Sequence, residues 1–434
     1  MRVEFAFGKS GLPLALPEGF RYCLLEARSA LPLGDAPAAI EQALDSPIAS
    51  APLGQLAAGK GSVAISVCDI TRPVPNKDIL PAVLRRLEAA GIPREKITIL
   101  IATGLHRPAT ETEIGQICGE AIARSYPVLN HRARELSEHQ YLGKTESGTP
   151  VYIDSRFVSA DLRITVGFIE PHLMLGFSGG RKLVAPGLAA AETISVLHSP
   201  RFMRDPKVTE GSVERNPLHH ELLEIARMAR HDFMIDVSLA RSPQGGQRFI
   251  AGVFAGHPVE AHRKGVEFVS RAMLETLEEP ADAVITSAAG YPLDLTFYQA
   301  LKGITAASHV VKPGGEILLL AACDEGTGGR EFTTMLRENP SGDEFLRKIA
   351  DAPVVPDQWQ LEKAALVAAR NRLLFYVPGV PREYSASIWG SVHTDVTEAV
   401  RSITRALPKN AQVALIPEGP YVLARVGKNG SAGS

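Results

Sequence analysis

Short apolar runs alternate along the chain with longer stretches in which apolar residues recur every three or four positions. The runs at Ser62–Cys68 and Ile97–Thr103 predict two buried strands. The stretch between them predicts an amphipathic helix, which Gly91 and Pro93 end. Its apolar face consists of Ile79, Leu80, Val83, Leu84 and Leu87. A strand, a helix and a strand of these lengths form a βαβ unit with parallel strands.

The same alternation recurs further along the chain. It predicts strands at Leu162–Phe168, Phe233–Ala240, Ala283–Ser287 and Glu316–Ala321, and helices at Leu218–Arg230, Pro258–Leu277 and Leu295–Ser308. The pattern resets near Glu278–Ala281, where a second α/β domain begins, to within about ten residues. We therefore expect a two-domain α/β protein with mainly parallel sheets, divided into residues 1–278 and residues 279–426.

Composition narrows the class of protein. The 434 residues are enough for two or three domains, and 45% hydrophobic with 22% charged residues is ordinary globular usage. This excludes a disordered chain, a collagen-like chain and a coiled-coil rod. A formal net charge of −2 argues against nucleic acid as an obligate partner, because phosphate binding needs a basic face.

The cysteines and the apolar runs indicate the compartment. The four cysteines lie far apart without a CxxC pair, which favours buried reduced thiols over disulfides or a zinc ribbon. No segment reaches the roughly 18 uncharged apolar residues of a membrane span, and the first residues lack a secretory signal pattern. We expect a soluble cytoplasmic protein with no membrane partner.

Chemically active side chains follow three of the predicted parallel strands. They belong to Asp69–Arg72 (DITR), Thr103–Arg107 (TGLHR) and Glu170–His172 (EPH). Ligands of open α/β sheets bind at the carboxyl ends of the strands. We expect an acid, two arginines and two histidines to converge on one rim.

The segment GFSGGRK at residues 176–182 is rich in glycine and ends in two cations. Glycines there would bring backbone N–H groups close to a phosphate, and Arg181 and Lys182 would supply positive charge. The spacing is not that of a Walker A loop. The alternative is a tight turn with two solvated cations.

Three of the twelve histidines are candidates for chemistry. His106 and His172 lie at strand ends, where histidine suits proton transfer or ligation of nickel or zinc. His198 ends a predicted helix, where the alternative role is an interaction with the helix C-terminus. Together the three could also form an open zinc site of a hydrolase.

The second domain carries a further set of polar residues. Asp294, Tyr298 and Lys302 are spaced to share one helix face, with Gln299 beside them. Tyr298 and Lys302 could bind an anionic group; a solvated stripe is the alternative. Trp359 is either a core residue or an apolar wall of a cleft.

Six segments carry a family resemblance. They are DITRPVPN, ATGLHRP, EPHLMLGFSGGRKLVAPGLA, ETISVLH, YPLDLTFYQALKG and DQWQ. In this order they resemble the nickel-dependent lactate racemase family over most of the chain. The resemblance implies two α/β domains with the active site in the inter-domain cleft: residues 1–278 bind the cofactor and carry catalysis, and residues 279–426 close the cleft.

The resemblance also implies a cofactor, the nickel-pincer nucleotide (pyridinium-3-thioamide-5-thiocarboxylic acid mononucleotide). Lys182 would anchor it covalently through a thioamide, and His198 would be the protein ligand to nickel. A histidine nitrogen together with the sulfur donors of the cofactor suits nickel, which favours a square-planar site. The other residues implied for this group are Thr71, Gly179 and Gly180 as nucleotide contacts, and Asp69, Tyr298 and Trp359 as orienting or wall residues.

For the substrate, the resemblance implies His106 and His172 as the two acid/bases, one for each enantiomer. Arg72, Gln299 and Lys302 would hold the carboxylate and polarise the reacting oxygen. The expected activity is racemisation or epimerisation of a 2-hydroxy acid (lactate, malate, an aryl or alkyl 2-hydroxy acid or a sugar acid) by reversible hydride transfer through a 2-keto acid. Cofactor-synthesis proteins would load the enzyme. A zinc hydrolase and a non-catalytic, cofactor-binding homologue are the alternatives.

Overall fold

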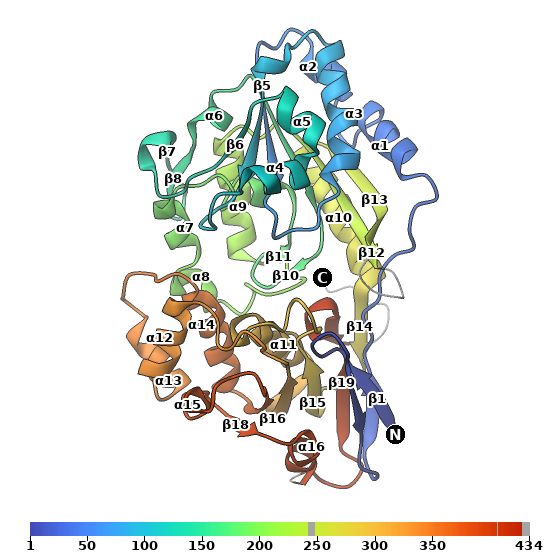
Figure 1. The fold of residues 1–434 in the computed structure, drawn as a ribbon, viewed down its shortest axis with the longest axis vertical. Coiled ribbons are helices and arrows are strands. Elements are labelled where there is room, and N and C mark those ends of the chain that lie inside the picture. The colour runs from blue at the N-terminus through green and yellow to red at the C-terminus, as the bar shows by residue number, and fades with distance from the viewer. Residues whose placement is uncertain (242–247, 406, 428–434) are drawn as a thin grey trace. The chain divides into compact units, whose positions relative to one another are not determined.

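The computed structural model describes residues 1–241, 248–405 and 407–427, and the chain divides into two units (Figure 1). The N-terminal unit comprises Ser29–His198 and Lys207–Ala272. The C-terminal unit comprises Met1–Arg28, Ser199–Pro206 and Met273–Ser434. Each unit contains a mainly parallel six-stranded sheet with helices, so the predicted fold class of two α/β domains is confirmed.

The sheet of the N-terminal unit has the strand order β13-β12-β9-β4-β5-β6. Its strands are β4 (Val63–Cys68), β5 (Ile97–Ala102), β6 (Val128–Asn130), β9 (Leu162–Phe168), β12 (Phe233–Arg241) and β13 (Arg248–Gly256). All neighbours pair in parallel except β13, which runs antiparallel to β12. The strands predicted from the apolar runs are confirmed, whereas the pattern did not single out β13.

The helices of this unit are α1 (Ala36–Asp45), α2 (Leu53–Ala57), α3 (Asn76–Ala89), α4 (Glu111–Cys118), α5 (Glu120–Ser125), α6 (Ser155–Val158), α7 (Ala191–Leu197), α9 (Pro217–Met228) and α10 (Pro258–Met273). All five apolar residues predicted for one face of α3 are buried. With α1 and α2 they cover one sheet face in a continuous apolar core. Smaller elements are η1 (Arg94–Lys96), η2 (Leu136–Glu138), η3 (Gly180–Leu183) and the hairpins β7 (His139–Lys144) with β8 (Pro150–Asp154) and β10 (Pro171–His172) with β11 (Gly176–Phe177).

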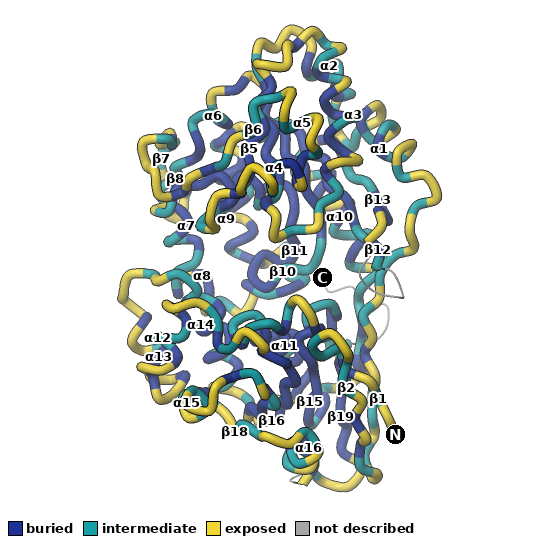
Figure 2. The backbone as a smooth tube through the Cα atoms, in the orientation of Figure 1, coloured by how far each residue is buried: buried dark blue, intermediate teal, exposed yellow. Residues whose placement is uncertain are grey.

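The sheet of the C-terminal unit has the order β18-β17-β16-β15-β19-β3 and is parallel throughout. Its strands are β3 (Arg21–Leu24), β15 (Ala281–Ser287), β16 (Val311–Leu320), β17 (Arg372–Tyr376), β18 (Ser391–His393) and β19 (Gln412–Ile416). The helices are α8 (Pro200–Met203), α11 (Phe297–Ser308), α12 (Arg330–Glu338), α13 (Gly342–Lys348), α14 (Gln358–Ala368), α15 (Arg382–Ser385), α16 (Val396–Arg405) and η4 (Gly419–Tyr421). Two strand pairs, β1 (Arg2–Phe5) with β2 (Leu12–Ala15) and β14 (Leu274–Leu277) with β20 (Leu423–Val426), complete the unit. The central strands of both sheets are buried (Figure 2).

The unit boundaries differ from the predicted division at residue 278. The first 28 residues belong to the C-terminal unit, because β3 pairs with β19 at the edge of that sheet. The segment Ser199–Pro206 also belongs there: Arg204 Nε lies 3.1 Å from Glu362 Oε1, and Lys363 Nζ donates to the Met203 carbonyl oxygen at 2.7 Å. The later boundary between the two units falls between residues 272 and 273.

Two local predictions were wrong. The helix predicted to Leu277 ends at Met273, and the last four residues form β14, which pairs with β20. Asp294 does not share a helix face with Tyr298, because α11 begins at Phe297. Its buried carboxylate instead accepts hydrogen bonds from the backbone N–H groups of Gly8 at 2.7 Å and Ala322 at 3.1 Å.

All four cysteines are free thiols. Cys118 and Cys323 are buried as predicted, while Cys23 and Cys68 are only half-buried. In the described part of the chain no helix has the length and apolar character that crossing a membrane requires.

Gly187 fixes the segment after η3 to the end of β5. Its carbonyl oxygen accepts from Gly104 N at 3.1 Å, and a Cβ here would lie 2.7 Å from the Leu183 carbonyl oxygen and 2.9 Å from Ala102 Cβ. We expect Gly187→Ala to lower the free energy of unfolding in urea by roughly 1–3 kcal/mol, because packed backbone must move. Circular dichroism would follow the transition.

The matched control is Gly54→Ala in α2, where nothing lies within 4 Å of the added carbon. This variant should be neutral or gain up to about 1 kcal/mol, because alanine has less freedom in the unfolded chain. Equal losses in both variants would contradict the steric explanation.

Candidate active site

The three polar segments predicted to converge do follow three neighbouring strands. In the sheet, β4 lies between β9 and β5, all parallel, with Cys68 opposite Ala102 and Val67 opposite Val166. The segments that follow these three strands therefore lie at one edge of the sheet. They carry Asp69, Thr103 and Glu170. The helical turn η3 packs onto the same strands, because Ser66 Oγ donates to the Leu183 carbonyl oxygen at 2.8 Å. This edge is the candidate site.

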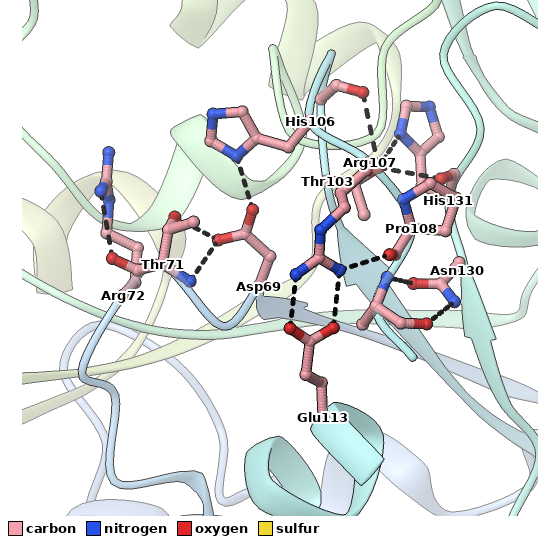
Figure 3. A network of polar contacts seen from close by, with 12 residues as sticks. Asp69, Thr71, Arg72, Thr103, His106, Arg107, Pro108, Glu113, Asn130 and His131 are labelled. Carbon is pink, nitrogen blue, oxygen red and sulfur yellow. Dashed lines mark hydrogen bonds and ion pairs between the residues drawn. The ribbon is translucent and has the colours of Figure 1, made fainter. Parts of the chain in front are cut away.

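His106 and Asp69 form a hydrogen-bonded pair at this edge (Figure 3). His106 Nδ1 lies 2.6 Å from Asp69 Oδ2, and Thr71 donates to Asp69 Oδ1 from its hydroxyl at 2.6 Å and its backbone N–H at 3.1 Å. Burial by itself raises the pKa of Asp69, but the hydrogen bonds from His106 and Thr71 lower it below its usual value. The ionised carboxylate holds the His106 proton on Nδ1, which leaves Nε2 as a proton acceptor.

His172 has the opposite arrangement of its ring nitrogens. It lies in the β10–β11 hairpin, and its Nδ1 accepts from the backbone N–H groups of Met174 and Leu175, both at 3.3 Å. In the neutral ring the proton is therefore on Nε2. The two neutral rings therefore present different atoms at Nε2, a lone pair on His106 and an N–H on His172.

Lys182 lies in η3 and is half-buried. Burial, followed by the charge of Arg72, lowers the pKa of its amine to about 8. Opposing effects come from Cys68, Glu170 and Asp69, which places the amine among the residues of the strand edge. An amine with this pKa is partly neutral near physiological pH, so it can act as a nucleophile.

His198 follows α7, and its Nδ1 donates to the Ile194 carbonyl oxygen at 2.9 Å. The ring thus contacts the helix C-terminus, and this contact places the lone pair on Nε2. Contact with the helix end and ligation of a metal are therefore compatible. Burial lowers the pKa of His198 to about 4, with the charge of Lys182 acting in the same direction. A neutral imidazole with an oriented Nε2 is the form that ligates a metal.

The donor set fits nickel held partly by a bound group better than a zinc centre of the protein alone. Within residues 1–241, 248–405 and 407–427, no three His, Cys, Asp or Glu side chains gather closely enough to hold a metal ion. The three-histidine zinc site is thus not formed. A single neutral histidine beside a nucleophilic lysine fits a cofactor that brings its own donors.

One cation of the glycine-rich segment does not act as predicted. Arg181 is only 2% exposed, and its guanidinium donates to the carbonyl oxygens of Leu175 and Phe177, both at 3.1 Å. The expectation that Arg181 supplies charge to a phosphate is wrong. The N–H of Gly180 donates to Asp236 Oδ2 at 2.8 Å, so this amide shapes the turn.

The other predicted residues have contacts of their own. Arg107 pairs with Glu113 of α4 through two hydrogen bonds of 2.7 and 2.6 Å (Figure 3). In the C-terminal unit Lys302 Nζ donates to Gln299 Oε1 at 2.6 Å on α11. In the same unit Tyr298 packs edge-on against Phe332, and Trp359 is half-buried at the start of α14.

Two supporting features were missed from the sequence. Thr103 donates to the His131 carbonyl oxygen at 2.8 Å, and His131 Nε2 lies 2.9 Å from His139 Nε2, which braces the turn that carries His106. Nothing in the pattern indicated this pair. Asp236 did leave a signal, namely a carboxylate inside the apolar strand FMIDVSLA.

Comparisons with known proteins identify the family. Residues 7–211 match the family described as Lactate racemase N-terminal domain, and residues 276–424 match Lactate racemase C-terminal domain. A lactate racemase of Thermoanaerobacterium thermosaccharolyticum is 32% identical over 98% of this chain and 99% of its own. One from Lactiplantibacillus plantarum is 36% identical over 89% of this chain and 90% of its own.

Solved structures give the same result for the fold. The lactate racemase apoprotein from Thermoanaerobacterium thermosaccharolyticum aligns with a TM-score of 0.89 at 32% identity, covering 98% of this chain and 100% of its own. A Thermotoga maritima protein aligns with a TM-score of 0.64 at 17% identity over 92% of this chain and 99% of its own, which shows a shared fold alone.

His131 makes stability depend on pH. Burial lowers its pKa to about 3, far below the usual histidine value of about 6.5, so the unfolded state binds its proton first as pH falls. Its contribution is complete above pH 6.5 and is lost toward pH 3. When the pH falls from 7.5 to 5.0, the free energy of unfolding of wild type should fall by about 2 kcal/mol more than that of His131→Gln. Urea unfolding at each pH measures both values.

The control is Ile101→Val, which trims the neighbouring strand without removing a titrating group. It should keep the wild-type difference between the two pH values. A His131→Gln profile parallel to wild type would contradict the assignment.

Proposed function

The chain belongs to the lactate racemase family and is an isomerase, and on this premise we propose that it inverts C2 of lactate or a related 2-hydroxy acid through a 2-keto acid. The observation that carries the proposal is the opposite proton placement on His106 and His172. Inversion needs one group to take the hydroxyl proton and a second group to return a proton for the other enantiomer.

Direct removal of the C2 proton of a 2-hydroxy acid is difficult, because that proton is very weakly acidic. Oxidation to a flat keto acid and reduction from the other face avoids this step. His106 Nε2 accepts the hydroxyl proton of one enantiomer, while Asp69 holds the resulting imidazolium. When the other enantiomer forms, His172 in its doubly protonated form gives its Nε2 proton to the oxygen and returns to the neutral ring. Roles exchange in the reverse direction.

The residues present fit a Lys-tethered nickel-pincer nucleotide. Lys182 would hold it through a thioamide and His198 Nε2 would ligate nickel, with Gly179 and Thr71 near the nucleotide and Asp69 orienting His106. When bound, this group supplies an acceptor and donor for the C2 hydrogen as hydride. We propose that cofactor-synthesis proteins load it in the cytoplasm, where the four free thiols stay reduced.

The residues proposed for substrate recognition lie on two segments of the chain. Arg72 follows β4 and can hold a carboxylate through two hydrogen bonds. On α11, Lys302 with Gln299 would polarise the reacting oxygen or hold the carboxylate, and Tyr298 and Trp359 would form walls. These residues would contact only the carboxylate and the 2-hydroxyl group of the substrate. Malate, sugar acids and larger 2-hydroxy acids therefore belong in the substrate panel.

Loading is the first test. After co-expression with cofactor-synthesis proteins, wild type should gain a nucleotide-sized mass with nickel and racemise enantiopure lactate or another 2-hydroxy acid in chiral chromatography. Lys182→Ala should lose the covalent mass, because the thioamide cannot form, and His198→Ala should be depleted of nickel. Both should lose nearly all activity.

A known racemase loaded in parallel is the control for this experiment. Unmodified wild type under conditions that load that protein would refute the proposed cofactor. A loaded protein that inverts no acid in a broad panel would instead favour the non-catalytic alternative.

The substrate clamp is tested by Gln299→Glu. A carboxylate beside Lys302 Nζ, in place of the amide oxygen now 2.6 Å away, would neutralise the ammonium and repel the substrate carboxylate. We expect KM to rise at least about tenfold, equivalent to about 1.4 kcal/mol, with a smaller change in kcat. Gln299→Met, which removes the hydrogen bond without adding charge, is the control. Equal KM values for the two variants would contradict the charge explanation.

A further inference from the structure

Beneath Lys182 lies a group of buried charges that the proposed reaction does not use. The odd-numbered residues Phe233, Ile235 and Val237 of β12 belong to the core with α1–α3, so the even-numbered residues face the opposite side of the sheet. Asp236 projects from that side and is fully buried. It meets the glycine-rich turn that contains Lys182.

Asp236 joins the turn to the sheet. Its Oδ2 accepts the N–H of Gly180 at 2.8 Å, and Asp236 lies opposite Gly167 of β9 in the parallel pairing of the two strands. A Cβ on Gly179, where φ is +90°, would lie 2.2 Å from Oδ2. The first residues of η3 therefore close directly on this carboxylate, and a side chain at position 179 would push them off.

Arg181 fixes the same turn from the inside. Besides the carbonyl oxygens of Leu175 and Phe177, its guanidinium lies 2.7 Å from His262 Nε2. Burial raises the pKa of Asp236 to about 7 and lowers that of Arg181 to about 9, and each opposes the shift of the other. Between these values both are charged, so a buried cation and a buried anion stabilise each other.

The direction of Lys182 follows from this anchoring. Successive side chains of a 3-10 turn point about 120° apart, because it has three residues per turn. With Arg181 locked into the interior and Gly180 N–H held by Asp236, rotation of η3 is fixed. Lys182 then projects toward the strand edge, where the charges of Arg72, Glu170 and Asp69 act on its amine.

We propose that Asp236, acting through Gly180 and Arg181, is a positioning residue that presents the Lys182 amine in its half-buried place. This inference rests on Lys182 as the cofactor anchor in the proposed function. It adds a residue outside the strand edge whose role is to keep the anchoring amine oriented and desolvated before any cofactor arrives.

The test measures the amine itself in apoprotein, without nickel, nucleotide or substrate. Lys182 would be acetylated at a series of pH values from 7 to 10. Peptide mass spectrometry would give its acetylation rate relative to that of exposed Lys60 in the same molecule. Wild type should show a midpoint near pH 8. In Asp236→Asn, which keeps the shape but loses the charge, the turn loosens and water reaches the amine.

We therefore expect the Asp236→Asn midpoint to rise by at least about one pH unit, so that Lys182 reacts about fivefold more slowly at pH 8. The matched control is Ser238→Ala, two residues along the same strand and also buried. It should keep the wild-type midpoint. An unchanged midpoint in folded Asp236→Asn, or an equal shift in Ser238→Ala, would overturn the proposal.

Hydrogen exchange on the wild-type apoprotein covers the case in which Asp236→Asn does not fold. The amide of Gly180 should exchange slowly, because it donates to a buried carboxylate. Exchange at the rate of an unstructured peptide would overturn the proposal. Neither readout depends on racemase activity, so failure here is distinguishable from failure of the proposed function.

Discussion

The parallel pairing of β4 with both β5 and β9 is the constraint on which the site depends. The register sets Cys68 opposite Ala102 and Val67 opposite Val166, so the three strands end at nearly the same level. Turns that start there must present their polar residues at one edge. A shift of one residue would turn Ser66 away from η3 and bury it in the apolar core on the other face.

The hydrogen bond that each histidine makes through Nδ1 determines whether its Nε2 carries a proton or a lone pair. His106 gives its Nδ1 proton to Asp69, His198 gives its own to the Ile194 carbonyl oxygen, and His172 accepts two backbone N–H groups instead. Three rings of the same chemistry thereby present different Nε2 atoms, and the roles that we propose for them are base, metal ligand and acid. The histidine side chains alone would not distinguish these roles.

The glycine-rich turn illustrates how burial reverses the meaning of a motif. Two adjacent cations near glycines are typical of phosphate binding, yet Arg181 points inward and Gly180 N–H is held by Asp236. Only Lys182 remains at the strand edge, with its amine partly desolvated. The turn is thus built to hold one lysine in place.

The sequence alone determined the local elements, the strand-end clustering and the family, because these depend on apolar periodicity and on short contiguous motifs. It placed β4, α3 and β5 within a residue or two and selected His106, His172, Lys182 and His198. Tertiary structure alone decided that β3 joins the C-terminal sheet and that Asp294 caps backbone amides. Pairing partners and inward-facing charges are set by residues distant in the chain, and no local pattern records them.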